Sequence, residues 1–171
     1  MARRSAAARV CLANTPDLPE AVRQLDLLLS GCEDRFVTYM VAVLDLDRFL
    51  ATIVNAVHLP PMLRRAGQAT VEELNRELAG LPLGVMGQPY EQTRVALQPG
   101  DTLVFYTDVV SEMRNRAGEM YGVERVRAVV QNAPADMAGM GTALLSDVQR
   151  FAEQRPPGDD MTILCLGRTR E

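Results

Sequence analysis

The sequence has no lysine and no tryptophan, and only one histidine and three cysteines in 171 residues. Without lysine, the chain cannot use a lysine side chain as a nucleophile. A mechanism that needs an imidazole must use His58, whose place before two prolines favours a structural role. Cys11, Cys32 and Cys165 are odd in number and lack Cys-x-x-Cys spacing, which argues against a disulfide framework or a zinc site. Such cysteines are typical of a reducing compartment, so we expect a cytoplasmic protein.

Long hydrophobic runs and an excess of positive charge are also missing. No apolar stretch approaches the ~20 residues that a membrane-spanning helix needs, so we expect no membrane segment. The formal net charge is -4, which argues against nucleic acid as a partner. Hydrophobic residues make up 47% of the chain and charged residues 23%, as in globular proteins. Because the chain has no repeat and no linker-like segment, residues 1–171 are expected to form a single domain.

Apolar periodicity predicts helices near both ends of the chain and strands between them. The expected helices are residues 2–13, 18–30, 123–131 and 137–154. The candidate strands are residues 36–46, 49–56, 62–65, 70–74, 93–97, 102–107 and 161–166, although 72–78 fits a helix equally well. The expected order is therefore helices, four or five strands, helices and a closing strand. This segregated order, with hairpins, indicates an antiparallel α+β layer architecture rather than a doubly wound parallel sheet.

Three aspartates lie next to strands, where a carboxylate can reach a cation. Asp108 follows an apolar strand, and Asp159 and Asp160 lie between a Pro-Pro-Gly turn and the last strand. Carboxylates that converge at strand ends would form a hard-oxygen site suited to Mg²⁺ or Mn²⁺. Spacing alone favours a different interpretation, in which Asp108 caps a helix starting at Val109 and the other two are solvated turn residues.

Seven short motifs occur together along the chain in one order. They are Phe36-Val37-Thr38, Leu44-Asp45, Asn55-Ala56-Val57-His58-Leu59-Pro60-Pro61, Gly80-Leu81-Pro82-Leu83-Gly84, Pro99-Gly100-Asp101, Tyr106-Thr107-Asp108 and Asp159-Asp160-Met161-Thr162. Each is weak by itself, but the set and its order resemble the metal-dependent protein phosphatases over residues 20–168. The most similar branch is the bacterial one typified by the stage II sporulation protein E phosphatase and the sigma-factor regulatory phosphatases.

The resemblance implies packed antiparallel sheets flanked by helices, which agrees with the expected element order. It also implies hydrolysis of phosphoserine or phosphothreonine on a protein partner, such as an anti-sigma-factor antagonist, by a water that two Mn²⁺ or Mg²⁺ ions activate. By motif match, Asp108, Asp159 and Asp160 are the metal ligands. The residues to which the match gives an architectural role are Asn55, His58, Gly80, Gly84, Thr107 and Thr162. An upstream sensor or receiver domain is common in this branch.

The chain departs from the family pattern at the first metal motif. The family's Asp-x-x-Gly-His-Gly, which supplies an aspartate that bridges both ions, is absent from the sequence. Residues 5–9 are similar to the helix that follows this motif, so we expect the domain to lack its first strands and this ligand. Asp17 and Asp26 are in or beside helices and are not convincing substitutes. An open sheet edge is then expected, which favours dimerisation or aggregation.

Two family glycines are replaced by Val57 and Val109. A β-branched residue is strained if φ is positive, whereas at negative φ it only adds bulk, and the sequence leaves both options open. With the bridging carboxylate missing, the chain alone is expected to be an inactive or impaired phosphatase. The alternative is a non-catalytic phosphatase-like module that binds a partner protein.

Overall fold

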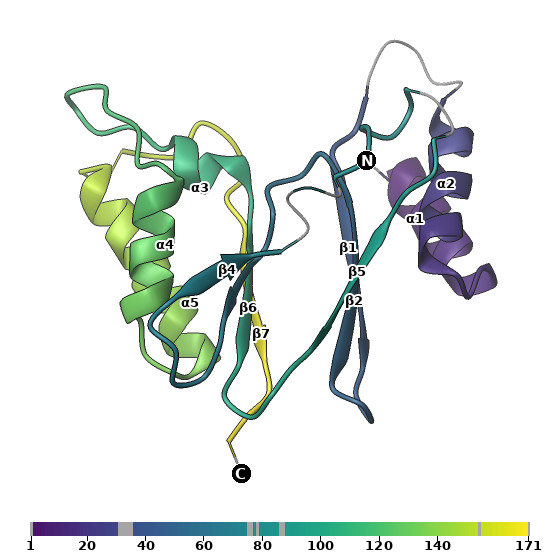
Figure 1. The fold of residues 1–171 in the computed structure, drawn as a ribbon. Helices are drawn as coiled ribbons and strands as arrows, with labels where there is room; N and C mark the ends of the chain where they lie inside the picture. The colour runs from purple at the N-terminus through teal and green to yellow at the C-terminus, as the bar shows by residue number, and fades with distance from the viewer. Residues whose placement is uncertain are drawn as a thin grey trace. The chain divides into compact units, whose positions relative to one another are not determined.

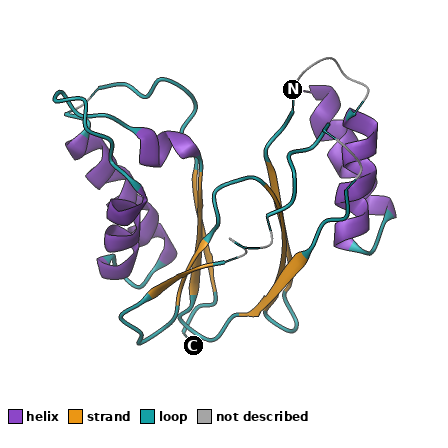
Figure 2. Cartoon of the chain, turned by 45° about the horizontal axis from the view of Figure 1, so that its top comes forward, coloured by secondary structure: helices purple, strands orange, loops and turns teal. Residues whose placement is uncertain are grey.

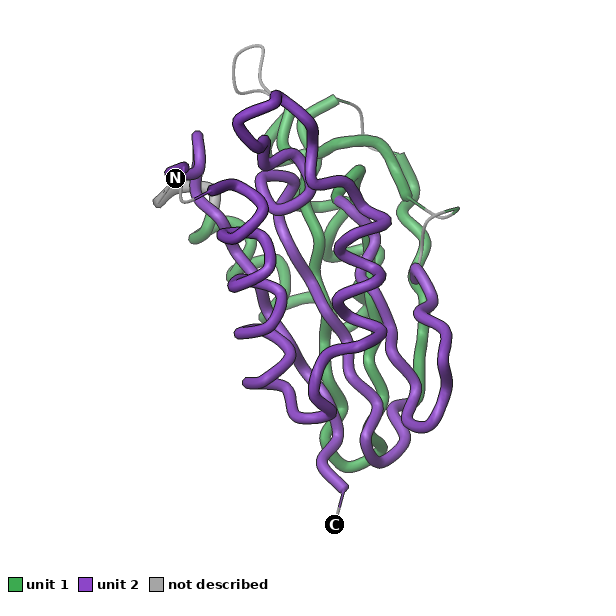
Figure 3. The backbone as a smooth tube through the Cα atoms, turned by 90° about the vertical axis from the view of Figure 1, so that its left-hand side faces the viewer, with its two compact units in different colours: residues 1–58, 75–96 green, residues 59–74, 97–171 purple. Residues whose placement is uncertain are grey.

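The structure is a computed structural model that describes residues 2–30, 36–74, 77, 79–85, 88–153 and 155–170. Helices come first in the described chain, followed by strands, further helices and one closing strand (Figure 1). The chain divides into two compact units, residues 1–58 with 75–96 and residues 59–74 with 97–171 (Figure 3). Each unit has its own antiparallel sheet, which confirms the α+β class. Within the described residues, no helix has both the length and the apolar character needed to cross a bilayer.

The first unit contains two helices and a three-stranded sheet. Its elements are α1 (Ala2–Asn14), α2 (Leu18–Leu29), β1 (Tyr39–Asp45), β2 (Leu50–Ala56) and β5 (Gln92–Ala96). β1 and β2 form the expected hairpin, and β5 pairs with the other side of β2. Asp17 begins α2 because its carboxylate accepts a hydrogen bond from the Glu20 N–H at 2.9 Å. The helical spacing of Leu18, Val22 and Leu25 then buries these side chains in the core of the unit.

The second unit contains a four-stranded sheet with helices beside it (Figure 2). Its elements are β3 (Met62–Arg64), β4 (Val71–Glu73), β6 (Thr102–Tyr106), α3 (Asp108–Glu112), α4 (Val123–Asn132), α5 (Met137–Phe151) and β7 (Ile163–Gly167). The strand order is β4-β3-β6-β7, and all neighbours are antiparallel. Met140, Leu144 and Val148 recur at helical spacing on α5 and are fully buried in one cluster with Val104 of β6. This apolar stripe explains why α5 packs on the sheet.

The expected elements are present to within a few residues, and the structure adds the short helix α3, which is not among the four expected helices. All six candidate strand segments before α3 are strands in the structure, whereas four or five were expected. The additional strand is residues 71–73, which pair with β3 rather than starting a helix. The strands on either side of Gln98–Asp101 also belong to different sheets. β5 pairs with β2, whereas β6 lies between β3 and β7. The turn between them therefore carries the chain from one unit to the other.

A buried carboxylate holds this turn. Asp101 is only 2% exposed, and it accepts hydrogen bonds from the Gln98 N–H at 2.9 Å, the Ala66 N–H at 2.8 Å and Arg65 Nη1 at 2.7 Å. Burial by itself would raise the pKa of Asp101, but these donors favour the charged form and lower the pKa below 3.8. Because Ala66 lies between β3 and β4, Asp101 ties two turns of the second unit together.

Candidate metal-binding site

Asp108 and the segment Asp159–Asp160 lie at the same end of two neighbouring strands, β6 and β7. The Thr107 N–H donates to the Thr162 carbonyl at 3.1 Å, and the Thr162 N–H donates to Thr107 Oγ1 at 3.0 Å. The Thr107 hydroxyl in turn donates to the Asp160 carbonyl at 3.4 Å. The two threonines therefore continue the β6–β7 ladder by one pair and bring the acidic segments together.

The three aspartates have exposed side chains. Thr107 occupies the N-cap position of α3, and Asp108 is the first residue of the helix. Asp108 Oδ1 accepts from the Val109 N–H at 2.9 Å, and Asp159 Oδ1 accepts from the Asp160 N–H at 2.8 Å. The helix thus begins one residue earlier than the capping interpretation supposed, and each of these two bonds engages only one carboxylate oxygen.

The donor chemistry of this site fits a hard divalent cation, but the number of converging donors does not complete a metal centre. Carboxylate oxygens are the ligands that Mg²⁺ and Mn²⁺ prefer. Across the described ranges, however, no three His, Cys, Asp or Glu side chains are arranged to hold one ion. Asp108, Asp159 and Asp160 therefore lie at one end of the sheet, but their side chains do not form a three-ligand group for one ion.

A cavity of about 360 Å³ lies beside these acids. Its lining residues are Val109, Glu112, Met113, Arg114, Arg155, Pro156, Gly158 and Asp159. The Arg114 guanidinium donates through Nη1 to the Gly118 carbonyl at 2.7 Å, which anchors this side chain at the cavity wall. Two guanidinium groups next to a candidate ligand can attract and orient an anionic group such as a phosphoryl.

Asn55 and His58 form the turn that follows β2. Asn55 is only 1% exposed, its Nδ2 donates to the His58 carbonyl at 2.9 Å, and its Oδ1 accepts from the His58 N–H at 2.8 Å. Both contacts are to the His58 backbone, so they fix the turn rather than the imidazole. The Asn55 carbonyl also accepts from the Gly80 N–H at 2.9 Å, which joins this turn to a second motif.

Gly80 and Gly84 occupy positions that other residues fit poorly. A Cβ on Gly80 would lie 2.6 Å from Cδ1 of Tyr90, which leaves no room for a side chain. Gly84 has a φ of 92°, and its N–H donates to Asp26 Oδ1 at 2.6 Å. The bond from Gly84 to Asp26 therefore holds the segment between the two glycines against α2. Burial, and then the charge of Asp26, raise the pKa of Tyr90 to about 12.

The two valines that replace family glycines have different backbone conformations. Val57 has a φ of 55°, a left-handed conformation that strains a β-branched residue, and its side chain is 47% exposed. Val109 lies inside α3 and is not among the described residues with positive φ. Only the substitution at Val57 is therefore costly to the backbone.

Sequence reasoning gave no role to two buried acids, Asp26 and Asp101. Asp26 is fully buried on α2, four residues after the core residue Val22, and holds the Gly84 amide. The position of Asp26 on the apolar face of a helix could have predicted this role, because a buried acid must accept hydrogen bonds from donors inside the protein. Asp101 belongs to the Pro99-Gly100-Asp101 motif, but the motif does not show that Arg65 and the Ala66 amide, from a turn distant in sequence, bind its carboxylate.

Solved structures from several bacteria have the same fold as this chain. The RsbU and RsbW domains of Rv1364c from Mycobacterium tuberculosis match at 24% identity and a TM-score of 0.78, covering 99% of this chain and 47% of that one. The SiaA-PP2C domain of Pseudomonas aeruginosa matches at 18% identity and a TM-score of 0.80, covering 96% and 66%. The phosphatase domain of SpoIIE from Bacillus subtilis matches at 16% identity and a TM-score of 0.66, covering 98% and 74%.

At these identities the structural matches establish the fold, which is that of PP2C-type phosphatase domains. This chain spans about half the length of the mycobacterial structure. A comparison with curated protein sequences gave no match. The family assignment comes from sequence: the family model described as stage II sporulation protein E (SpoIIE) matches residues 1–169. The chain therefore belongs to the SpoIIE family, which shares its fold with bacterial PP2C-type phosphatases.

Proposed function

We propose that this chain is a serine/threonine protein phosphatase domain that acts on a phosphorylated bacterial signalling protein, such as an anti-sigma-factor antagonist. The observation that carries the proposal is the Thr107–Thr162 pairing, which joins Asp108 to the Asp159–Asp160 segment in a chain of the SpoIIE family. These segments are the parts of the family's metal motifs that the sequence retains.

In this proposal Asp108 and Asp159 are ligands for Mn²⁺ or Mg²⁺, with Asp160 beside them. When bound, such ions lower the pKa of a coordinated water and offset negative charge on the phosphoryl oxygens. Arg155 and Arg114, at the wall of the adjacent cavity, bind and orient the phosphoryl group of the partner protein. No side chain has to act as a nucleophile, so the mechanism does not need lysine, which the sequence lacks.

The ligand set limits the activity expected of the chain by itself. The Asp-x-x-Gly-His-Gly motif is absent from the sequence, and the described side chains include no three-ligand cluster. Two cations held by so few carboxylates would be poorly neutralised, so we expect weak metal binding and a low rate. The same observation favours a second candidate function, a non-catalytic module that binds a phosphoprotein. RsbU and RsbW domains occur together in the mycobacterial structure, and we propose a similar multidomain setting for this chain.

Metal binding and hydrolysis can be measured separately. Isothermal titration with Mn²⁺ should show binding to the parent chain that Asp108→Asn weakens at least about tenfold, because a direct ligand is lost. Asp47→Asn is the matched control, since Asp47 is an exposed residue in the turn between β1 and β2. Hydrolysis of a phosphoserine peptide with Mn²⁺ present should then follow the same ranking of variants.

The outcomes distinguish the two functions. Mn²⁺ binding and peptide hydrolysis that both depend on Asp108 support the phosphatase. Phosphopeptide binding without hydrolysis, unaffected by Asp108→Asn, supports the non-catalytic module. Equal Mn²⁺ affinities of the parent, Asp108→Asn and Asp47→Asn proteins would overturn the assigned metal site.

A further inference from the structure

A second cavity adjoins the one beside the acids. It has a volume of about 700 Å³ and lies between the C-terminal half of α5 and the loop that leads to β7. Its walls include Leu145 and Arg150 of α5 and Arg155 and Pro156 of the loop. Met113, Arg155 and Pro156 line both cavities. This second cavity, which we call the α5 groove, therefore lies next to the place proposed for the phosphoryl group.

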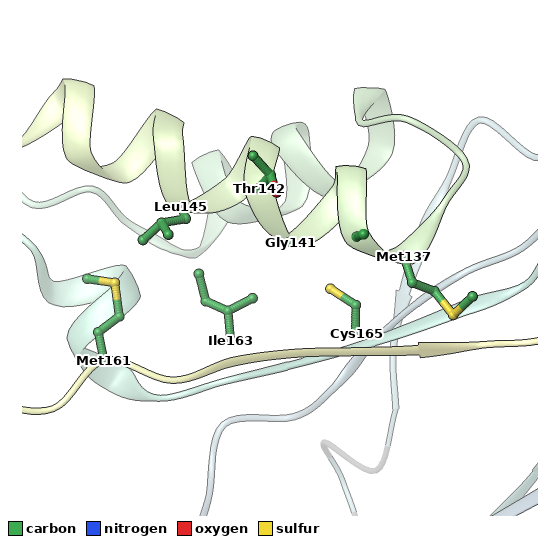
Figure 4. A pocket seen from close by; sticks show the side chains of 8 residues that line it. Met137, Gly141, Thr142, Leu145, Met161, Ile163 and Cys165 are labelled. Carbon is green, nitrogen blue, oxygen red and sulfur yellow. The ribbon is translucent and has the colours of Figure 1, made fainter.

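The α5 groove is separate from the open edge of the sheet. None of the described residues that line it belongs to β7. Another hollow, of about 650 Å³, lies along β7 itself, and Leu145 and Met161 face each other at one end of it (Figure 4). We expect the family's first strands to cover that edge, whereas the α5 groove continues to Met113 and the cavity beside the acids.

The lining of the α5 groove combines apolar surface with positive charge. Met113, Leu145 and Met161 supply the apolar part, and Arg150 and Arg155 supply two guanidinium groups. None of the described lining residues is acidic, although the formal net charge of the chain is -4. Methionine and arginine are both enriched at contacts between proteins. A peptide segment with a large apolar side chain and a nearby carboxylate is complementary to such a surface.

Arg150 is well placed to bind a carboxylate of a partner. Its side chain is 75% exposed, and its Nη1 contacts Asp147 Oδ1, one turn earlier on α5, at 3.3 Å. The other oxygen of Asp147 accepts from the Tyr121 hydroxyl at 2.6 Å, so both oxygens of this acid are engaged. A guanidinium has five N–H donors. The contact with Asp147 therefore orients Arg150 and leaves donors for a second carboxylate.

The loop that forms the opposite wall is constrained before any partner binds. Pro156 is followed by a second proline, and each proline ring fixes its own φ. Before the prolines, the Arg155 N–H donates to the Ala152 carbonyl at 3.0 Å, and after them the Asp160 carbonyl accepts from a hydroxyl at the end of β6 at 3.4 Å. Because the loop is attached at both ends, little of its conformational entropy is lost on binding.

We propose that the α5 groove binds the segment of the phosphoprotein partner next to its phosphorylated residue. One large apolar side chain of this segment lies between α5 and the loop, and one acidic side chain binds Arg150. The proposal rests on the proposed function, because the phosphoryl group has to occupy the cavity beside the acids. Arg155 lines both cavities, so one continuous segment can fill both. The groove thereby selects among phosphoproteins by the residues around the phosphoserine.

A peptide library tests this selection without hydrolysis. Each peptide has at its centre the phosphonate analogue of phosphoserine, in which a CH₂ group replaces the ester oxygen and cannot be cleaved. The positions on both sides are random, and a matched library has serine at the centre. Immobilised protein with Mn²⁺ present should retain the phosphonate library over the serine library. The retained peptides should be enriched in a large apolar residue at one position and in Asp or Glu at another.

A charge reversal tests the acidic preference. Arg150→Glu should weaken binding of the selected peptide about fivefold and remove the preference for Asp or Glu, because an attraction becomes a repulsion. Arg48→Glu is the matched control and should leave both unchanged. Arg48 is 80% exposed and contacts Asp45 three residues earlier, just as Arg150 contacts Asp147, but it belongs to the first unit.

A second pair of variants tests the apolar preference. Leu145→Ser should weaken binding of the selected peptide about fivefold, because the partner's apolar side chain loses part of its contact surface. Leu27→Ser is the control, since Leu27 is a 50% exposed leucine on the helix α2 of the first unit.

The outcomes separate this inference from the proposed function. Retention of the phosphonate library without any preference around the phosphonate overturns the groove and leaves the proposed function standing. Preferences that Arg150→Glu or Leu145→Ser leaves unchanged do the same. Equal retention of the phosphonate and serine libraries overturns phosphoryl binding in the proposed function, and the role of the groove is then overturned with it.

Discussion

Val57 offers the sharpest test of the backbone geometry described here. Its φ of 55° is a conformation that glycine adopts without cost and that a β-branched residue adopts rarely. The residue stands at a position where the phosphatase motif has glycine. We therefore predict that Val57→Gly makes the protein more stable, although it removes an apolar side chain.

The size of the gain follows from three contributions. A left-handed φ costs a non-glycine residue about 1–3 kcal/mol, and we take about 2.5 kcal/mol for valine because both methyl groups crowd the backbone. Glycine loses about 0.75 kcal/mol more backbone entropy on folding. Val57 is 47% exposed, so truncation sacrifices about half of its transfer free energy, about 0.7 kcal/mol. The sum is a stabilisation of about 1 kcal/mol.

Val109→Gly is the matched control, because the same substitution occurs there at a family glycine position in helical backbone. It should destabilise the protein by about 1 kcal/mol, from lost helix propensity and lost contact. The free energies of unfolding of the two variants, from urea titrations followed by far-UV circular dichroism, should thus differ by about 2 kcal/mol. In thermal melts the gap should be about 4–8 °C in Tm. A Val57→Gly protein that melts at or below Val109→Gly would refute the assigned strain.

Three further substitutions test the buried polar and packed positions. Asp101→Asn should lower the free energy of unfolding by about 2 kcal/mol near neutral pH. Because folding lowers the pKa of Asp101, the stabilisation from its charge is present above the unfolded pKa of 3.8 and is lost as the pH falls through the folded pKa. The urea midpoints of the parent and the variant should therefore converge in acid. Gly80→Ala should lower the Tm by about 4–8 °C, since its Cβ would collide with the ring of Tyr90. Leu144→Ala, at a fully buried site, should cost about 2–5 kcal/mol in the urea titration, whereas Leu145→Ala, 40% exposed, should cost less than about 1 kcal/mol.

Four of the helices and the two hairpins, β1–β2 and β3–β4, could be predicted because their signals are local. The apolar spacing on α2 and α5 fixes both the element type and the buried face, and the short polar joint between β1 and β2 leaves a hairpin as the simplest arrangement. A turn signal does not say which strands pair across it. Gln98–Asp101 has the composition of a turn between paired strands, yet β5 pairs with β2 in one sheet and β6 pairs with β3 and β7 in the other.

The parts that could not be predicted depend on contacts between distant segments. Asp101 stays ionised while buried because Arg65 and the Ala66 amide reach it from another turn, in addition to the Gln98 amide of its own turn. The φ of Val57 is likewise set by the Asn55–His58 turn rather than by valine's own preference, which is why the same replacement is strained there and relaxed at Val109. Sequence patterns indicate the conformation that a residue prefers by itself. At Asp101 and Val57, contacts with other residues determine the ionisation and the backbone conformation instead.

Segments that resemble the family's metal motifs are a weaker sign of catalysis than of the fold. Thr107 and Thr162 bond to each other through backbone and hydroxyl groups, and these bonds complete the β6–β7 ladder whether or not a cation is bound. A chain that needs only the fold therefore has a reason to keep both threonines. Asp108 is different, because its side chain is exposed and its bond to the Val109 amide is one that asparagine can also make. If the proposed metal site is correct, removal of the carboxylate charge of Asp108, rather than of the threonines beside it, should abolish phosphatase activity and leave the fold intact.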